Sequence, residues 1–398
     1  MADRIRVLSV IDGLGYAGDE TRMLNMSRGL DRARFSHSVL TLNPLAYGDA
    51  NEYRARKNDY LAAGIRVDDL ADCAPERPLQ LSSIAGRLYD KTGIFRRARR
   101  LARLVREWKV DVIDGHLQSA GLVAVLASRW TGIPSTVTLY GGYTQSFQVD
   151  WPWTTRAALR LTTSVLTDSA IRADQMRAFL KGNASKVAVI PNGIAEPQPA
   201  RTNSEMRRHF GLPEDPNIRI VGQVGRLIEY KGHDVLIRTA QKVLREEPNI
   251  IFLLVGYPRA ESYRQHLHSL AKELGISEKI AIREYPGNIA DVWGIIDVHA
   301  HASLFDSLPI SITEGMALSK PAVVTSVGGI PEMVSHNETG LIVPPGDPDA
   351  LAAGIVELLR RPELARRLGA NARARYEKRY RPEIMVRALE DHFAKLVK

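Results

Sequence analysis

Cysteine is nearly absent from this chain, and a long apolar segment is missing altogether. The single cysteine, Cys73, excludes an intramolecular disulfide framework and suits a reducing compartment. No stretch reaches the roughly 18 consecutive apolar residues that a membrane-spanning helix needs. The first ten residues, MADRIRVLSV, are charged and pass directly into a strand pattern, so we expect no signal peptide. These absences favour a cytoplasmic protein.

Recognisable metal-ligand spacings are also missing. The 10 histidines and the acidic residues show no arrangement that predicts a zinc or magnesium site. We therefore expect no bound metal, and we expect any anionic ligand to be neutralised by lysine and arginine side chains.

A glycine-rich turn follows the first apolar run. The segment VIDGLGYAGDE (10–20) places Gly13, Gly15 and Gly18 in G-x-G-x-x-G spacing between a strand pattern and a helix pattern. A dinucleotide site also needs an acidic residue at the end of the second strand, where this chain has Leu42 and Asn43. The fingerprint is incomplete, so we interpret the turn as an approach for another anionic or sugar ligand and keep an NAD-dependent dehydrogenase as an alternative.

The remaining organisation predicts an α/β protein with two domains. A length of 398 residues exceeds one ordinary core, and apolar runs alternate with helical patterns, which is typical of parallel sheets covered on both faces. Strands are predicted at 5–11, 38–42, 110–114, 136–139, 164–167 and 187–190, and at 218–224, 250–255, 280–283, 298–301, 322–325 and 340–343. We divide the chain into a Rossmann-like domain at 1–190, a linker at 191–201, a second Rossmann-like domain at 202–375, and a terminal helix at 376–398 that is able to pack back on the first domain.

The second half carries the sharper chemical signals. In VGQVGRLIEYKGHD, Arg226 and Lys231 lie between a predicted strand and a predicted helix, where parallel sheets bind ligands and where two cations can grip a diphosphate. A solvated charged loop explains these two residues equally well when they are taken alone. Further on, Asp306 and Glu314 are separated by seven residues, the first in a loop and the second in the following helix.

Together these segments resemble the family 4 retaining glycosyltransferases, which have the two-domain GT-B fold. The chain contains GRLIEYKG, DSLPISITEGMA, PAVVTSVGGIPE and GLIVPPGD, which match the family pattern across nearly all of the C-terminal half. In the N-terminal half the resemblance is looser and rests on GYAGDETRML, DVIDGHLQSAGLVA and IPNGI. The resemblance implies two Rossmann-like domains that face each other across a deep cleft.

The resemblance also implies roles for individual residues. Arg226 and Lys231 would bind the donor diphosphate, Glu314 the ribose, and Asp306 and His116 the transferred sugar. The catalytic set is thus Arg226, Lys231, Asp306 and His116, and the wider donor site adds Gly15, Gly18, Gly225, Gly256, Tyr285, Pro286, Ser307, Leu308 and Glu314. Asp306 departs from the family by replacing a glutamate, and Tyr140 stands where the family often has histidine.

The reaction implied by the resemblance moves a sugar from a nucleoside diphosphate sugar to a hydroxyl acceptor without a metal and with retention of configuration. A front-face departure is the mechanism usually proposed. UDP is the expected nucleotide, with GDP and ADP open, and no cofactor is required. The acceptor, whether lipid-linked or a glycan, is expected to contact Tyr140, Gly141 and Tyr143, although the aromatic residues of 141–153 equally suit an anchor for the next helix.

One basic segment accounts for most of the net charge of +9. Residues 86–109 hold nine basic and two acidic residues, and IFRRARRLARLVREW (94–108) places its arginines on one side of a helical wheel. Arg96, Arg99, Arg100 and Arg103 form either an ordinary solvated face or a docking face for an anionic membrane surface or an anionic acceptor. The second interpretation places the protein on the inner face of the cytoplasmic membrane. Nucleic acid is not expected as a partner, because aromatic residues are not interleaved there.

Other function classes fit the same fold. A nucleotide-sugar 2-epimerase would convert the donor without any acceptor. A non-catalytic binding module, for a nucleotide sugar or a membrane surface, would bind without ever releasing free nucleoside diphosphate. The sequence favours the glycosyltransferase over both.

Overall fold

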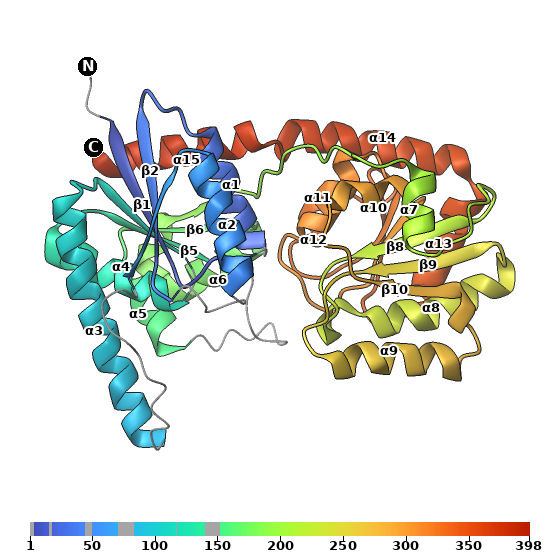
Figure 1. The fold of residues 1–398 in the computed structure, drawn as a ribbon. Coiled ribbons are helices and arrows are strands. Elements are labelled where there is room, and N and C mark those ends of the chain that lie inside the picture. Colours follow the sequence, from blue (N-terminus) through green and yellow to red (C-terminus); the bar gives the residue numbers. More distant parts are fainter. Residues whose placement is uncertain (1–3, 16–17, 44–49, 71–82, 117, 140–151) are drawn as a thin grey trace. The chain divides into compact units, whose positions relative to one another are not determined.

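The chain folds into two α/β units, each built on one parallel sheet, as seen in a computed structural model that describes residues 4–15, 18–43, 50–70, 83–116, 118–139 and 152–398 (Figure 1). The N-terminal unit comprises residues 1–193 and 382–398, and the C-terminal unit comprises residues 194–381. Both sheets are wound in the parallel order that the strand–helix alternation predicts.

The N-terminal unit has a seven-stranded sheet in the order β3-β2-β1-β4-β5-β6-β7. Its strands are β1 (Ile5–Ile11), β2 (Phe35–Thr41), β3 (Arg66–Asp69), β4 (Val112–His116), β5 (Ser135–Leu139), β6 (Ser164–Thr167) and β7 (Val187–Val189). Its helices are α1 (Gly18–Gly29), α2 (Ala50–Ala62), α3 (Ser83–Glu107), α4 (Gln118–Thr131), α5 (Trp153–Leu161), α6 (Ala170–Leu180) and α15 (Pro382–Val397), with a short 3₁₀ helix, η2 (Lys181–Lys186).

Alternating side chains of this sheet feed two separate cores. Leu8 and Val10 of β1 pack with α3, α4, α5 and α6, whereas Val7 and Ile11 pack with α1, α2 and α15. Apolar residues on both faces are expected for a parallel sheet that is covered twice. The C-terminal helix α15 therefore belongs to this core, through residues such as Phe393.

The C-terminal unit has a six-stranded sheet in the order β10-β9-β8-β11-β12-β13. Its strands are β8 (Arg219–Val224), β9 (Ile250–Val255), β10 (Ile280–Arg283), β11 (Val298–His301), β12 (Ala322–Thr325) and β13 (Leu341–Val343). Its helices are α7 (Asn203–His209), α8 (His233–Glu246), α9 (Glu261–Glu273), α10 (Ile289–Ile295), α11 (Ile310–Ala317), α12 (Ile330–Met333), α13 (Pro348–Arg360) and α14 (Pro362–Arg379), with the 3₁₀ turns η3 (Glu229–Lys231) and η4 (Ser277–Lys279).

The order of this second sheet reverses at β8. Strand β8 pairs with β9 on one side and with β11 on the other, so the connections after β8 and β11 leave in opposite directions. Such a switch point in an open parallel sheet opens a ligand site at the carboxyl ends of the strands. Lys231 follows β8 and Asp306 follows β11, so the fold brings two predicted residues to this point.

Candidate functional site

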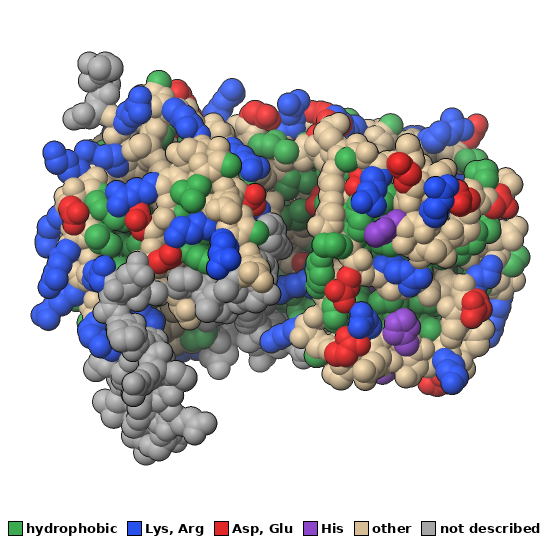
Figure 2. Space-filling view, viewed as in Figure 1, with side chains coloured by type: hydrophobic (Ala, Val, Ile, Leu, Met, Phe, Trp, Pro, Cys, Tyr) green, Lys and Arg blue, Asp and Glu red, His purple; other side chains and the backbone are tan. Residues whose placement is uncertain are grey.

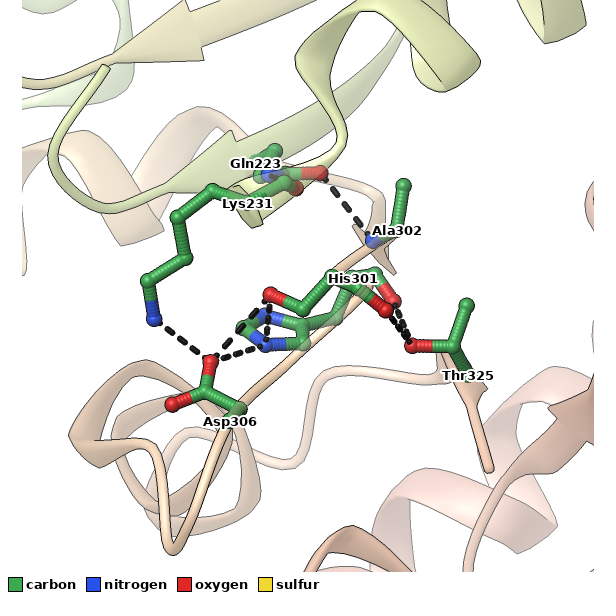
Figure 3. Close-up of polar contacts among 7 residues, drawn as sticks. Gln223, Lys231, His301, Ala302, Asp306 and Thr325 are labelled. Atoms are coloured by element: carbon green, nitrogen blue, oxygen red, sulfur yellow. Dashed lines mark hydrogen bonds and ion pairs between the residues drawn. The ribbon is translucent and has the colours of Figure 1, made fainter. Parts of the chain in front are cut away.

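Lys231 and Asp306, which are 75 residues apart in sequence, form an ion pair at the carboxyl ends of β8 and β11 (Figure 3). The Lys231 Nζ lies 2.5 Å from Asp306 Oδ2, and the two side chains are only 14% and 13% exposed. Because the pair is largely shielded from water, its electrostatic interaction is stronger than that of a surface salt bridge. The two sequence predictions thus converge on one contact.

Gln223, the fifth residue of β8, ties the two strand ends together. Its amide nitrogen donates to the Lys231 carbonyl over 2.8 Å, and its Oε1 accepts from the Ala302 backbone N–H over 3.1 Å. Gly232 follows with φ of +67°, and a Cβ there would meet the Ala302 carbonyl oxygen at 2.0 Å. A glycine is needed at this position, because the turn that carries Lys231 approaches the backbone after β11 directly.

Asp306 is held by one of its two carboxylate oxygens. Besides Lys231, His301 Nε2 lies 3.0 Å and Ser303 Oγ lies 3.2 Å from the same Oδ2 (Figure 3). Burial would raise the pKa of Asp306, but the Lys231 ammonium and the His301 hydrogen bond outweigh it and hold the pKa well below its usual value. Within the described residues Oδ1 has no hydrogen-bond partner, so this oxygen can accept from a ligand.

Strand β12 and the turn after it contact the loop that carries Asp306 and hold its backbone in place. The Thr325 hydroxyl donates to the carbonyls of His301, over 3.3 Å, and Ser303, over 2.6 Å (Figure 3). Gly328 has φ of +51°, and a Cβ there would lie 1.6 Å from the Asp306 carbonyl oxygen. The glycine pair in VTSVGGIPE therefore allows this turn to contact the Asp306 backbone.

Three buried histidines lie close to the Lys231–Asp306 pair or to one another. His233, His299 and His301 are buried, and burial lowers the pKa of all three, of His233 to about 3. Among the described residues no hydrogen-bond partner is found for either ring nitrogen of His299. Uncharged, buried imidazole rings screen the charge of Lys231 less than water would. The electrostatic attraction between Lys231 and an anion is therefore stronger.

Glu314 on α11 has one strong neighbour, the indole of Trp293. The Trp293 Nε1–H donates to Glu314 Oε2 over 2.9 Å, and the indole is fully buried on α10. Burial raises the pKa of Glu314 from 4.5 to about 7, and the indole hydrogen bond only partly opposes this shift. A carboxylate held at a desolvated position gains from a ligand that donates hydrogen bonds to it.

Arg226 lies in the loop after β8 with its side chain exposed, and no described residue pairs with its guanidinium. The neighbouring backbone is ordered by strand-like bonds, since Gly225 N–H donates to Val255 and Gly256 N–H donates to Arg283. A guanidinium in this position is available to an anion at the strand ends.

The other predicted donor residues lie around the same edge of the sheet, in different settings. Ser307 and Leu308 are buried just before α11, and Gly329 N–H donates to the Ser307 carbonyl. The Tyr285 ring is buried beside Phe210 and its hydroxyl donates to Asp291 over 2.8 Å, whereas Pro286 is exposed. The predicted contact of this turn with the base stays a prediction.

The N-terminal unit holds His116 in a buried polar network. His116 Nε2 lies 2.8 Å from Asp114 Oδ2 and 3.3 Å from Ser9 Oγ, and Thr138 donates to Asp114 Oδ1 over 2.7 Å. Burial would raise the pKa of Asp114, but His116 and Thr138 hold it below its usual value. Gly15 is buried after β1 and Gly18 begins α1; their predicted contacts with a donor, and that of His116 with the sugar, stay predictions.

The remaining predictions divide between described and undescribed residues. Tyr140, Gly141 and Tyr143 lie outside the described residues. Arg96, Arg99 and Arg103 are exposed on α3, and Arg100 is partly buried. The described residues contain no group of three or more His, Cys, Asp or Glu side chains placed to hold a metal ion. Within the same part of the chain, no helix combines the length and the apolar character that crossing a bilayer requires.

Sequence reasoning missed three residues that organise the site, Gln223, His301 and Trp293. Gln223 is a buried amide in a strand that is apolar after its first residue, Arg219, and a buried amide needs hydrogen-bond partners, which is a usable signal. His301 precedes Asp306 by five residues and offered a weaker hint. Trp293 had no local signal, because its contact with Glu314 spans 21 residues and depends on how α10 packs.

Comparison with known proteins assigns both halves to related families. Residues 203–375 match the model described as "Glycosyl transferases group 1", and residues 17–193 match the "Glycosyl transferase 4-like domain". Among curated proteins, a D-inositol 3-phosphate glycosyltransferase of Streptomyces scabiei is 31% identical over 56% of this chain and 51% of its own length. Another, from Corynebacterium efficiens, is 28% identical over 66% of each chain. The match thus spans between about half and two thirds of these relatives.

Solved structures share the fold along the whole chain. A glycosyltransferase from Rickettsia africae superposes with a TM-score of 0.81 at 19% identity, covering 100% of this chain and 99% of its own. Anabaena Alr3699/HepE in complex with UDP-glucose gives a TM-score of 0.77 at 20% identity, covering 98% and 99%. At these identities the likeness establishes the fold, which is the GT-B arrangement of two Rossmann-like domains.

Proposed function

Because this chain belongs to the group 1 glycosyltransferase family, we propose that it transfers a sugar from a nucleoside diphosphate sugar to a hydroxyl acceptor. The observation that carries the proposal is the Lys231–Asp306 pair at the β8–β11 switch point, with one Asp306 oxygen lacking a partner among the described residues. In this arrangement the Lys231 ammonium would bind a phosphate, and the adjacent Asp306 carboxylate would accept a hydrogen bond from a sugar hydroxyl.

The diphosphate would bind between the Lys231 ammonium and the exposed Arg226 guanidinium. Arg226 can bind two phosphate oxygens at once, while Lys231 acts as a point charge near the buried histidines. Asp306 pairs with the ammonium before the donor arrives, and the phosphate would take over part of that interaction. Glu314, held by Trp293, would accept hydrogen bonds from the ribose.

In the proposed step, the bond between the anomeric carbon and the β-phosphate oxygen breaks while a bond from that carbon to the acceptor oxygen forms. The acceptor proton moves to a β-phosphate oxygen, and nucleoside diphosphate leaves. Lys231 and Arg226 stabilise the negative charge that grows on the leaving phosphate, which is how fixed cations lower such barriers. Attack from the same face retains the anomeric configuration and needs no separate base.

We propose that a sugar hydroxyl donates to Asp306 Oδ1, and that His116, Gly15 and Gly18 have the sugar and donor contacts that the family resemblance implies. UDP is the nucleotide we propose, supported by the fold shared with Alr3699/HepE, which binds UDP-glucose. GDP and ADP sugars are the alternatives. A phosphorylated or lipid-linked hydroxyl acceptor fits the basic N-terminal unit, and the D-inositol 3-phosphate glycosyltransferases among the relatives support a phosphorylated one.

A thermal-shift panel of UDP-, GDP- and ADP-sugars tests the donor. We expect one nucleotide to raise the melting temperature of the wild type and to have no effect on Arg226→Ala. Lys242→Ala is the matched control, because Lys242 pairs with Asp349 over 2.7 Å on the surface of α8 and plays no part in the proposed site. The same donor should stabilise this control fully.

Product analysis separates the enzyme classes. Release of free nucleoside diphosphate that depends on an acceptor supports the transferase. Conversion of the sugar nucleotide without an acceptor would show an epimerase, and donor binding without release under any condition would show a binding module. No stabilisation by any sugar nucleotide would refute the donor site.

A further inference from the structure

Helices α3, α4 and α5 form one layer over the sheet of the N-terminal unit. Their inward sides share a core through Ile94, Ala98 and Leu101 of α3, Val123 of α4 and Leu159 of α5. The opposite sides of these helices face away from the sheet. The side chains exposed on these outward sides do not take part in this core, so we consider whether they form a binding surface.

The outward side of this layer is strongly basic. Residues 93–107, 118–131 and 153–161 hold nine arginines and one glutamate. Arg96, Arg99 and Arg103 are exposed, and among the described residues no carboxylate pairs with Arg99 or Arg103. In Figure 2, Lys and Arg side chains gather along the edge of the unit that α3 forms. An excess of exposed arginine over acidic side chains attracts a polyanionic surface.

Contrary to the expectation from the sequence of 94–108, large aromatic side chains are exposed among these arginines, and two of them come from neighbouring helices. Phe95 of α3 is 54% exposed, Trp130 of α4 is 40% exposed, and Trp153 of α5 is 53% exposed. The Phe95 and Trp130 rings stack, with centroids 6.4 Å apart, and Arg106 donates to the Trp130 carbonyl over 2.7 Å. Exposed aromatic residues beside cations are typical of surfaces that insert into the interfacial region of a membrane.

We propose that this basic–aromatic face, defined by Phe95, Arg96, Arg99, Arg103, Trp130 and Trp153, docks the N-terminal unit on an anionic lipid bilayer. The arginines would pair with lipid phosphates while the aromatic rings enter the headgroup region. The stacked Phe95 and Trp130 rings favour lipid over single-stranded nucleic acid, because their faces are turned toward each other rather than open to bases. This inference is independent of the proposed donor site.

Vesicle sedimentation of the full chain tests the proposal. We expect binding to phosphatidylcholine vesicles that contain phosphatidylglycerol, weak binding to phosphatidylcholine alone, and weakening of the first by salt. Arg99→Gln with Arg103→Gln should lower the partition coefficient about fivefold for each arginine removed. Phe95→Ser with Trp130→Ser should lower it about tenfold.

Matched controls separate this face from general charge and hydrophobicity. Arg366→Gln with Arg367→Gln changes two exposed arginines of α14, and Leu61→Ser changes a 50% exposed apolar residue of α2 on the other layer. Both should bind vesicles as the wild type does. If the controls lose as much binding as the test variants, or if the wild type does not bind anionic vesicles, the proposal is wrong.

Brominated lipids give a second readout that does not depend on how well a variant folds. Wild-type tryptophan fluorescence should be quenched when bromine lies near the headgroups, and absence of quenching in bound protein would overturn aromatic insertion. Heparin and poly(U) serve as soluble polyanions. Tight binding to either that is sensitive to the arginine pair but not to the aromatic pair, without vesicle binding, would assign the face to a polyanion instead.

Discussion

Each unit of this chain places an aspartate beside a histidine near the carboxyl end of a central strand, and the two pairs differ in their surroundings. In the N-terminal unit Asp114 and His116 are 2.8 Å apart with side chains 2% exposed, and both Asp114 oxygens have partners. In the C-terminal unit Asp306 and His301 are 3.0 Å apart, but Asp306 also pairs with Lys231 and has one oxygen without a described partner.

Asp114 has partners on both oxygens, whereas Asp306 has its described partners on Oδ2 alone, and we propose that Oδ1 accepts from a ligand. Asp114 is surrounded by donors from its own unit, so removing its charge disturbs the packed interior. Asp306 has its described donors on one oxygen, so we expect a change at its second oxygen to disturb the packed interior less. Two aspartate–histidine pairs of similar composition thus differ in how many carboxylate oxygens have a hydrogen-bond partner within the described residues.

The largest expected effect is on turnover, from Lys231→Ala. Loss of the ammonium should lower kcat by about 10²–10³-fold, because a fixed charge at the leaving phosphate contributes in that range. Steady-state release of nucleoside diphosphate measures it, with Lys242→Ala expected to retain wild-type turnover. Equal losses of kcat in Lys231→Ala and Lys242→Ala would show that the Lys231–Asp306 pair has no special role in turnover.

The second prediction concerns the buried Asp114–His116 pair of the N-terminal unit. Asp114→Asn should lower the free energy of unfolding by about 2–3 kcal/mol, because a buried hydrogen-bonded charge is lost among neighbours that cannot reach water. Asp306→Asn should cost less, since Lys231 can turn toward solvent. Urea denaturation at neutral pH compares the two variants, and a larger loss for Asp306→Asn would reverse the comparison.

The third prediction uses the raised pKa of Glu314. Its folded pKa of about 7 lies above the ordinary 4.5, so the folded state holds the proton more tightly, and wild-type stability falls as pH rises between these values. Glu314→Gln does not titrate. The variant should therefore gain about 1–3 kcal/mol relative to wild type between pH 5 and pH 8, allowing for partial exposure.

Chemical denaturation at these two pH values measures this gain, and donor affinity provides the functional half of the test. Glu314→Gln should bind the sugar nucleotide more weakly at pH 8 although it is more stable there. A stability difference that does not change with pH would mean that the carboxyl group is not desolvated as the structure indicates.

The smallest expected effect sharpens the role of the exposed cation. Arg226→Lys keeps the charge but loses the two-pronged hydrogen bonding of the guanidinium, so kcat/KM should fall by about tenfold. Arg226→Ala should fall further, and Arg259→Lys, a change nearby on the following loop, is the control. If Arg226→Lys matches the wild type, charge alone is sufficient at this position.

Much of the fold follows from local patterns in the sequence. The apolar runs at 5–11 and 250–255 are strands over those same residues, and the arginine-rich 94–108 is the end of a helix whose apolar side is buried. Strand β3 (Arg66–Asp69) was not predicted, because a four-residue strand with two aspartates carries no apolar run. It forms only because β2 offers an edge with which to pair.

The candidate site divides in a similar way. Arg226, Lys231, Asp306 and Glu314 stand out in the sequence because charged residues follow predicted strands in family-like motifs. Their supports do not stand out: Gln223 contacts Ala302 across 79 residues, and Trp293 reaches Glu314 from another helix. No local pattern encodes such contacts, because they depend on which strands become neighbours.

The sequence by itself determined the strands, the loops that follow them and the charged residues that those loops carry, because these depend on periodicity over a few residues. Only the tertiary structure decided that Asp114 is enclosed and that Asp306 keeps an oxygen without a described partner. That outcome depends on the donors that distant strands bring to each carboxylate, and on the burial that makes every missing partner matter.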